Sequence, residues 1–352
     1  MNRRAPQRVR LGMALLLVLL ASAGSLVAQQ KLSTTIYFDY SQYLTTDGYR
    51  TNVTKNIVNT FNFRRAYFRY DNKINDRLSF RLTFDADTLK AVNVLGTADD
   101  KFRPYLKHVY FEYADLIPKS VIRVGMADTL TFKLAEDRWG YRSVAKTLVD
   151  GYSDITGRSV DATSSDLGFS ILGSVTKQLR YGLGVVTGAS YTRPENDKFK
   201  KVAGNIQLIP IAGLSFVGYI DYEKQDATRD AYTYKGDIFF EMIKNLTVGF
   251  EYFTYNNELN VDKVKGEYNR TGWSAWGRYI IKPDKFALFA RYDNYEPNTV
   301  TDNDETRLVI AGLDWTPWVT NVRIQPNIWF FDYTDTAKKD DIYFALTFFM
   351  SF

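Results

Sequence analysis

Basic side chains recur on the polar face of several extended segments of this chain. From 77 to 87 every even position is apolar and every odd position is polar, so Arg77 and Arg81 share the polar face. Arg123 stands between two apolar residues and is assigned to the same kind of face. In a narrow opening of low dielectric constant, fixed charges attract and filter ions. Arg77, Arg81 and Arg123 are therefore candidates for the lining of such an opening.

Carboxylates fall on the same faces, and opposed rows of charge that only solvate each other are the alternative. The acidic residues of this set are Asp85, Asp87, Glu112, Asp221, Asp237, Glu241, Glu251 and Asp293. A charged side chain that faced lipid would be costly, so both interpretations place these residues toward water.

The longest connection between extended segments, from 128 to 162, carries the second set of candidates. They are Lys133, Arg138, Arg142, Lys146 and Arg158, and carboxylates are interspersed among them. Long ordered connections in compact proteins are usually functional. We expect this one to contain a short helix near 134–147 and to fold inward, where its basic groups would favour anions. A solvated loop with internal ion pairs is the alternative.

Catalytic and metal-binding patterns are weak. His108 is the only histidine, and a Ser-His-acid site would need a nucleophile beside it. No serine lies close to it in the sequence, so a pore-lining or structural histidine is favoured. The acidic run 301–305 offers oxygens to calcium but lacks the spacing of a full calcium loop. We expect no enzyme activity, no catalytic residue, no metal and no cofactor.

The elements that must position these residues are β-strands. Alternation of apolar and polar residues predicts one half-buried strand at a time, and it recurs in sixteen segments. They lie near 31–43, 58–71, 76–88, 105–115, 119–127, 163–174, 177–191, 199–209, 212–223, 230–242, 245–256, 267–280, 284–295, 304–315, 320–333 and 340–352.

The connections between these segments alternate between short and long. An even number of antiparallel strands, with tight turns at one end and longer loops at the other, is typical of outer-membrane barrels. Unpaired backbone groups cannot remain in hydrocarbon, so the first strand must pair with the last. We predict an all-β transmembrane antiparallel barrel of sixteen strands, wide enough for a water-filled lumen.

The two ends of the chain agree with export to a membrane. Four arginines, an apolar run at 11–20 and small residues before Ala28 predict a signal peptide at 1–28, followed by a barrel at 29–352. Without that leader the charge is nearly balanced, so a nucleic-acid partner is not expected. The last segment ends in Phe352, which resembles the C-terminal signature that the outer-membrane assembly machinery recognises. Tyrosine and tryptophan near strand ends are expected to contact lipid headgroups.

Residues 58–126 resemble the phosphate-selective porin O/P family. The resemblance rests on Phe61-Asn62-Phe63-Arg64-Arg65-Ala66-Tyr67-Phe68-Arg69, on Leu78-Ser79-Phe80-Arg81-Leu82-Thr83-Phe84-Asp85, and on Leu106-Lys107-His108-Val109-Tyr110-Phe111-Glu112-Tyr113 followed by Ile122-Arg123-Val124-Gly125. It implies a sixteen-stranded, trimeric channel for small anions in the bacterial outer membrane. Asp128 stands where the family commonly has a basic residue, and this departure argues against phosphate specificity.

These observations predict a porin that lets small hydrophilic solutes diffuse passively, narrowed by residues 128–162 and weakly selective for charge. The expected partners are outer-membrane lipid, the solutes, the assembly machinery and two further copies of the chain. A barrel-embedded hydrolase and a hydrophobic-solute channel of the fatty-acid type are the alternatives; the latter would need an apolar lumen.

Overall fold

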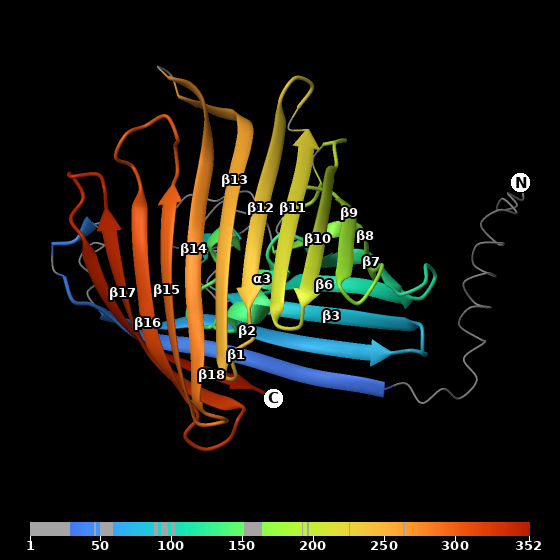
Figure 1. Ribbon diagram of the computed structural model, residues 1–352, viewed down its shortest axis with the longest axis horizontal. Coiled ribbons are helices and arrows are strands. Elements are labelled where there is room, and N and C mark those ends of the chain that lie inside the picture. The colour runs from blue at the N-terminus through green and yellow to red at the C-terminus, as the bar shows by residue number, and fades with distance from the viewer. Residues whose placement is uncertain are drawn as a thin grey trace, which may run out of the picture.

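A computed structural model gives the architecture, and it describes residues 29–45, 47–49, 59–87, 91–92, 98–99, 103–150, 164–191, 193–195, 197–224, 226–262 and 265–352. The predicted signal peptide, residues 1–28, lies outside the described residues. Sixteen antiparallel strands form a closed barrel in the order β1-β18-β17-β16-β15-β14-β13-β12-β11-β10-β9-β8-β7-β6-β3-β2. The predicted fold class is confirmed (Figure 1). No helix among the described residues is long and apolar enough to cross a membrane.

The strand boundaries follow the predicted segments closely. The barrel strands are β1 (Gln29–Tyr43), β2 (Asn59–Lys73), β3 (Leu78–Asp87), β6 (Arg103–Ala114), β7 (Ser120–Asp128), β8 (Ser165–Ser174), β9 (Leu179–Val186), β10 (Lys201–Ile211), β11 (Leu214–Lys224), β12 (Asp230–Phe240), β13 (Leu246–Asp262), β14 (Gly266–Lys282), β15 (Phe286–Glu296), β16 (Thr306–Trp315), β17 (Val322–Tyr333) and β18 (Asp341–Ser351). β9 is shorter than predicted and β13 is longer. A two-stranded ribbon of β4 (Ala91–Val92) and β5 (Ala98–Asp99), in the second long connection, was not predicted.

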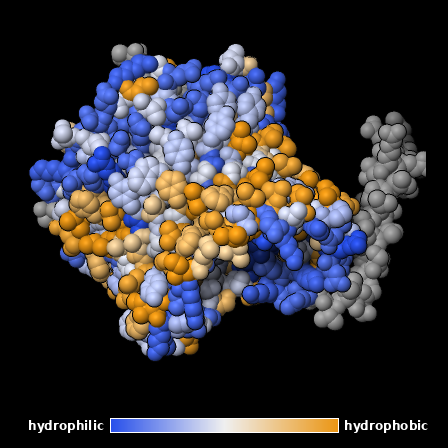
Figure 2. Space-filling view, viewed as in Figure 1, coloured by the Kyte–Doolittle hydropathy of each residue, from blue (hydrophilic) through white to orange (hydrophobic). Residues whose placement is uncertain are grey.

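The two-residue period places apolar side chains on the outer face of the wall. On β11, Phe216 and Ile220 are 40% and 50% exposed, whereas Tyr219 and Asp221 between and beyond them are 6% and 3% exposed. Figure 2 shows hydrophobic residues gathered in a band across the wall, with hydrophilic residues on either side of it. Such a band suits contact with hydrocarbon, because charged side chains are costly there.

The barrel closes where its first and last strands meet. β1 and β18 pair in register from Thr35 with Ser351 to Tyr43 with Tyr343. Beyond that ladder, Thr34 and Phe352 exchange two backbone hydrogen bonds of 2.8 and 2.9 Å. Every strand of the barrel therefore has a neighbour on both sides, which satisfies the backbone groups that a membrane could not solvate.

Two bulges interrupt the ladders on one side of the barrel. Tyr37 of β1 pairs with Arg65 while Phe38 pairs with Phe63, so Arg64 is an extra residue in β2. In the same way Lys107 is an extra residue in β6 opposite β3. An extra residue changes which face the following side chains occupy. Each bulge therefore turns two consecutive residues toward the inside of the barrel.

Candidate functional site

The segment 129–150 leaves β7 and follows the inner side of the wall. Asn205 of β10 donates a hydrogen bond to the carbonyl of Leu130 (3.1 Å), and Thr131 donates one to the hydroxyl of Tyr219 on β11 (2.9 Å). Helix α3 (Lys133–Trp139) comes next and contacts β13 and β14. The predicted short helix is therefore present, though it is shorter than expected.

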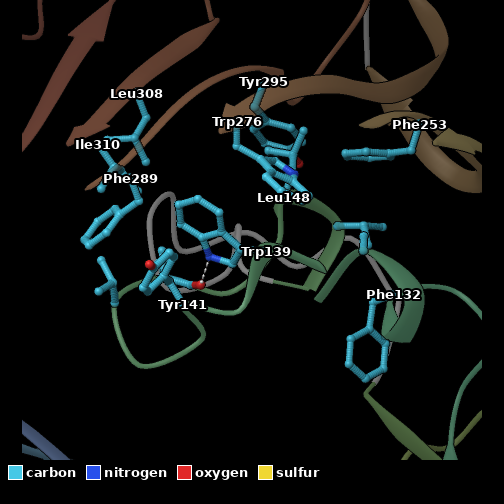
Figure 3. Packing of buried hydrophobic residues seen from close by; sticks show 14 of the residues in the cluster. Phe132, Trp139, Tyr141, Leu148, Phe253, Trp276, Phe289, Tyr295, Leu308 and Ile310 are labelled. Atoms are coloured by element: carbon cyan, nitrogen blue, oxygen red, sulfur yellow. Dashed lines mark hydrogen bonds between the residues drawn. The ribbon is translucent and has the colours of Figure 1, made fainter. Parts of the chain in front are cut away.

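Trp139, the last residue of α3, is the centre of the packing between this segment and the wall. Its side chain is 0% exposed, and its Nε1–H donates to the carbonyl of Ala145 at 2.9 Å. The centre of its ring lies 5.6 Å from the ring centre of Trp276 on β14 and 5.9 Å from the ring centre of Phe289 on β15. The ring centres of Tyr141 and Phe289 are 4.3 Å apart. Figure 3 shows these rings around Trp139, which joins α3 to both the wall and the turn that follows.

Two inward-facing glycines leave space for the rings on the wall. A Cβ atom on Gly249 would lie 2.2 Å from the indole of Trp276, and one on Gly312 would lie 2.4 Å from the ring of Phe289. Real Cβ atoms do not approach other atoms so closely, so an alanine at either position would displace the ring. The wall is therefore shaped to receive the segment.

The inner face of β12 to β17 carries a large apolar patch beside buried charged pairs such as Lys235 with Asp237 and Arg291 with Asp293. Leu308 and Ile310 of β16 are 0% exposed, whereas Val309 between them is 40% exposed. The buried wall residues of this kind are Phe239, Phe253, Tyr255, Trp276, Phe289, Tyr295, Leu308, Ile310, Trp329 and Phe331. Asp237, Glu251 and Asp293 lie on the inner face as expected, whereas the apolar residues beside them were not expected there. The apolar side chains are covered by residues 132–149 of the segment, which pack against them.

The opposite part of the inner face, on β2, β3 and β6, carries charge. At the β2 bulge Arg64 donates to the carbonyls of Ser143 and Val144, both at 2.9 Å, and pairs with Asp39 at 3.3 Å. The adjacent Arg65 is 7% exposed. Both arginines face inward because of the bulge, and Arg64 connects β2 to the segment.

The β6 bulge places Lys107 and His108 on the same inner face, 3% and 4% exposed. His108 Nε2 lies 3.1 Å from Oδ1 of Asp128, at the end of β7. Its cross-strand partner on β3 is Thr83. No hydrogen bond joins His108 to a serine or threonine hydroxyl among the residues that the structure describes, so the arrangement is a histidine–carboxylate pair beside the root of the segment.

Three basic side chains converge on the hydroxyl of Tyr67, in the middle of β2. Arg65 Nη1 lies 2.9 Å from it, Lys107 Nζ 3.1 Å and Arg142 Nε 3.4 Å. Arg65 and Lys107 also pair with Asp85, at 3.4 and 3.3 Å. The three donors come from β2, β6 and the segment, so the Tyr67 hydroxyl is the point where the charged wall and the segment meet.

Arg142 is held by two carboxylates of its own segment. It pairs with Glu136 of α3, and its Nη1 lies 2.7 Å from Asp150. Burial raises the pKa of Glu136 above its ordinary value, against the attraction of Arg142. Burial also opposes ionisation of Asp150, but Arg142 and Lys146 outweigh it and lower the pKa of Asp150 to about 2. Asp150 is therefore the permanent counter-charge of Arg142.

Solved structures with the same architecture are outer-membrane channels. They include the outer membrane channel DcaP of Acinetobacter baumannii, at 13% identity and a TM-score of 0.63, with 92% of this chain and 97% of that chain covered. OmpF of Salmonella typhi in complex with daunomycin has 12% identity and a TM-score of 0.62, with 92% and 97% covered. The anion-selective porin from Comamonas acidovorans has 9% identity and a TM-score of 0.62, with 92% and 100% covered.

The chain has the porin fold. At these identities the likeness concerns the fold alone. No protein-family profile and no curated protein matches the sequence, and membership of the phosphate-selective O/P family stays a prediction.

Of the three basic residues predicted to line the pore from strands, two lie on the inner face and one does not. Arg77 precedes β3 and is exposed in a turn rather than on the strand. Arg81 and Arg123 do face inward, and each has a carboxylate partner, Asp71 at 2.5 Å and Glu112 at 2.6 Å.

The basic residues predicted in the long connection are mostly paired as well. Lys133 pairs with Asp137 along α3. Arg138 lies 3.6 Å from Glu241 and 4.6 Å from the ring centre of Phe239. The main chain of Lys146 accepts a hydrogen bond from Arg291 of β15. Arg158 lies outside the described residues. Internal ion pairing, the alternative weighed for this connection, is therefore present.

Three features of the site were not predicted from the sequence. They are Lys107, the contact of Arg142 with Tyr67, and the buried aromatic residues on the inner face of β12 to β17. A small recess also lies between the start of the segment and β7 to β11, against small inward residues such as Gly125, Gly168 and Gly184. No cluster of three or more histidine, cysteine or acidic residues suited to a metal ion occurs in the described part of the chain, and this includes the acidic run 301–305.

Proposed function

We propose that this protein is an outer-membrane porin, a water-filled channel through which small hydrophilic solutes diffuse passively. The observation that carries the proposal is the closed wall with an apolar outer band and a segment packed along its inner side. A pore of this design selects by the width that the segment leaves open and by the charges around that opening.

The narrowest part of the pore, in this proposal, lies between the segment 129–150 and the wall of β2, β3 and β6. Arg64 and Arg142 both connect the segment to β2, and the aromatic contacts of Trp139 hold its other side against β14 and β15. Since the segment is fixed on both sides, the opening has a constant width, and solutes are excluded above a definite size.

We further propose a weak preference for anions rather than phosphate specificity. Most basic groups near the opening are matched by a carboxylate. Arg69 of β2 and Arg278 of β14 are on the inner face, and no ion-pair partner is found for either among the described residues. These two basic side chains would attract anions and bias permeation without forming a strong site.

Export, membrane insertion and assembly complete the proposal. Residues 1–28 would direct export, and β18, which ends at Ser351 beside the exposed Phe352, would be recognised by the outer-membrane assembly machinery.

We propose a homotrimer, the state in which Vibrio cholerae OmpT has also been solved, at 13% identity. Cross-linking of the purified protein in detergent would show a species of three chains; a single chain only would refute this part.

Planar-bilayer recording tests the central proposal. The purified protein should insert from detergent and give stepwise, ohmic conductance in KCl, and liposomes that contain it should swell in small sugars but not in large ones. A protein that stays soluble without detergent, or that gives no conductance steps, would contradict the proposal. The reversal potential in a KCl gradient should show modest anion preference; cation preference would remove the anion statement and leave the pore.

A further inference from the structure

The hydroxyl of Tyr67 has more hydrogen-bond donors than it can accept. Arg65, Lys107 and Arg142 direct donors at it from three different elements, at 2.9, 3.1 and 3.4 Å. A phenol oxygen offers two lone pairs, so the longest of the three bonds is also the weakest. One neutral oxygen therefore occupies the meeting point of three basic side chains.

The carboxylates nearby do not take the place of this oxygen. Asp85 is 0% exposed and lies 3.3–3.4 Å from Arg65 and Lys107. Glu136 and Asp150 hold the Nη1 atom of Arg142, whereas the Nε atom is the one directed at Tyr67. The hydroxyl of Tyr67 is thus an acceptor that all three basic side chains share, whatever other partners they have.

We propose that Tyr67 determines how strongly the pore holds small oxyanions, because its hydroxyl is a built-in neutral acceptor at the point on which three basic side chains converge. The inference rests on the proposed channel function and adds the residue that separates passage from binding. With the hydroxyl present, its oxygen fills this point and an anion moves on. Without it, each of the three basic side chains loses one acceptor at the same point, and an anionic oxygen is the ligand that such a point attracts.

Tyr67→Phe tests this by removal of a single oxygen. The aromatic ring stays, and with it the contacts of Lys107 and Arg65 with the ring at 4.9 and 5.6 Å. Single-channel KCl current is recorded while potassium sulfate is added. Sulfate should block the variant at a concentration about tenfold lower than it blocks the wild type, the change expected from one hydrogen bond to a charged group.

Two further variants keep the test specific. Tyr110→Phe removes a hydroxyl from the same wall, where the ring lies below Arg81 and Arg123, and it should leave the sulfate block unchanged. Tyr67→Phe combined with Lys107→Met removes one of the three donors and should restore weak block. Unchanged block in Tyr67→Phe, or equal strengthening in Tyr110→Phe, would overturn the inference. A wild type without KCl conductance would instead overturn the proposed function.

Discussion

The indole of Trp139 meets the indole of Trp276 edge to face, with 5.6 Å between the ring centres. The contact joins a connecting segment to a barrel strand at the point where Gly249 of the neighbouring strand has no side chain. Aromatic pairs of this geometry are worth about 0.5–1.5 kcal/mol beyond the area that they bury. The position of the segment, and with it the width of the proposed opening, therefore depends on this pair.

Trp139→Ala should widen the channel. Loss of a buried tryptophan costs about 3–5 kcal/mol, and here the loss falls on the docking of the segment rather than on the strand ladders. We expect a higher single-channel conductance and faster proteolysis within 133–150. Trp318→Ala is the matched control, since Trp318 is 71% exposed. Equal conductance of Trp139→Ala and the wild type would show that the segment does not set the width.

Gly249→Ala should disturb the same contact from the side of the wall. The new Cβ would lie 2.2 Å from the Trp276 indole, and overpacking of this kind costs about 1–3 kcal/mol. A lower midpoint of thermal unfolding and an altered conductance are expected. Gly218→Ala places a Cβ where nothing lies within 4 Å, so it should change neither quantity. Similar effects of both substitutions would mean that space at Gly249 is not the cause.

His108 should account for any change in charge selectivity between pH 8 and pH 5. It is the only histidine, and histidine is the side chain whose ordinary titration falls in this range. It lies on the inner wall beside Lys107, near Arg69 and Asp128. Protonation would add positive charge, so the reversal potential should shift toward anions as the pH falls. His108→Gln should abolish that shift; an identical shift in the variant would assign it elsewhere.

Asp150 should keep Arg142 in place well into the acidic range. Its pKa of about 2 is below the ordinary value of 3.8, so the ionised carboxylate stabilises the folded segment fully above the ordinary value. That contribution is lost as the pH falls through about 2. Because the pKa of Glu136 is raised, the test uses a His108→Gln, Glu136→Gln background, in which conductance should stay constant from pH 7 to 4 and change below it. Asp150→Asn should show the altered conductance already at pH 7.

Much of the barrel could be predicted because lipid and water impose a two-residue period on each strand. Phe216 and Ile220 face outward as that period requires, and all sixteen barrel strands were placed near their observed positions. The period says nothing of an extra residue, so the inward turn of both Arg64 and Arg65 was not foreseen. Nor did it foresee that the inward Leu308 and Ile310 are apolar, since their partner is a distant connection. The sequence did contain a sign of this apolar inner face. Leu308, Val309 and Ile310 are three apolar residues in a row, so both faces of the strand are apolar there.

Arg64 fixes the phase of β2. If it were removed and the ladder with β1 closed up, one half of the strand would exchange its two sides: either Arg65 and Arg69 would point into hydrocarbon, or Phe61 would point into water. An arginine at the bilayer midplane costs about 2–4 kcal/mol. Loss of Arg64 would therefore destabilise the barrel, because the register shift moves the side chains of half the strand to the opposite face. The number of residues between Phe63 and Ala66 is therefore as constrained as their identity.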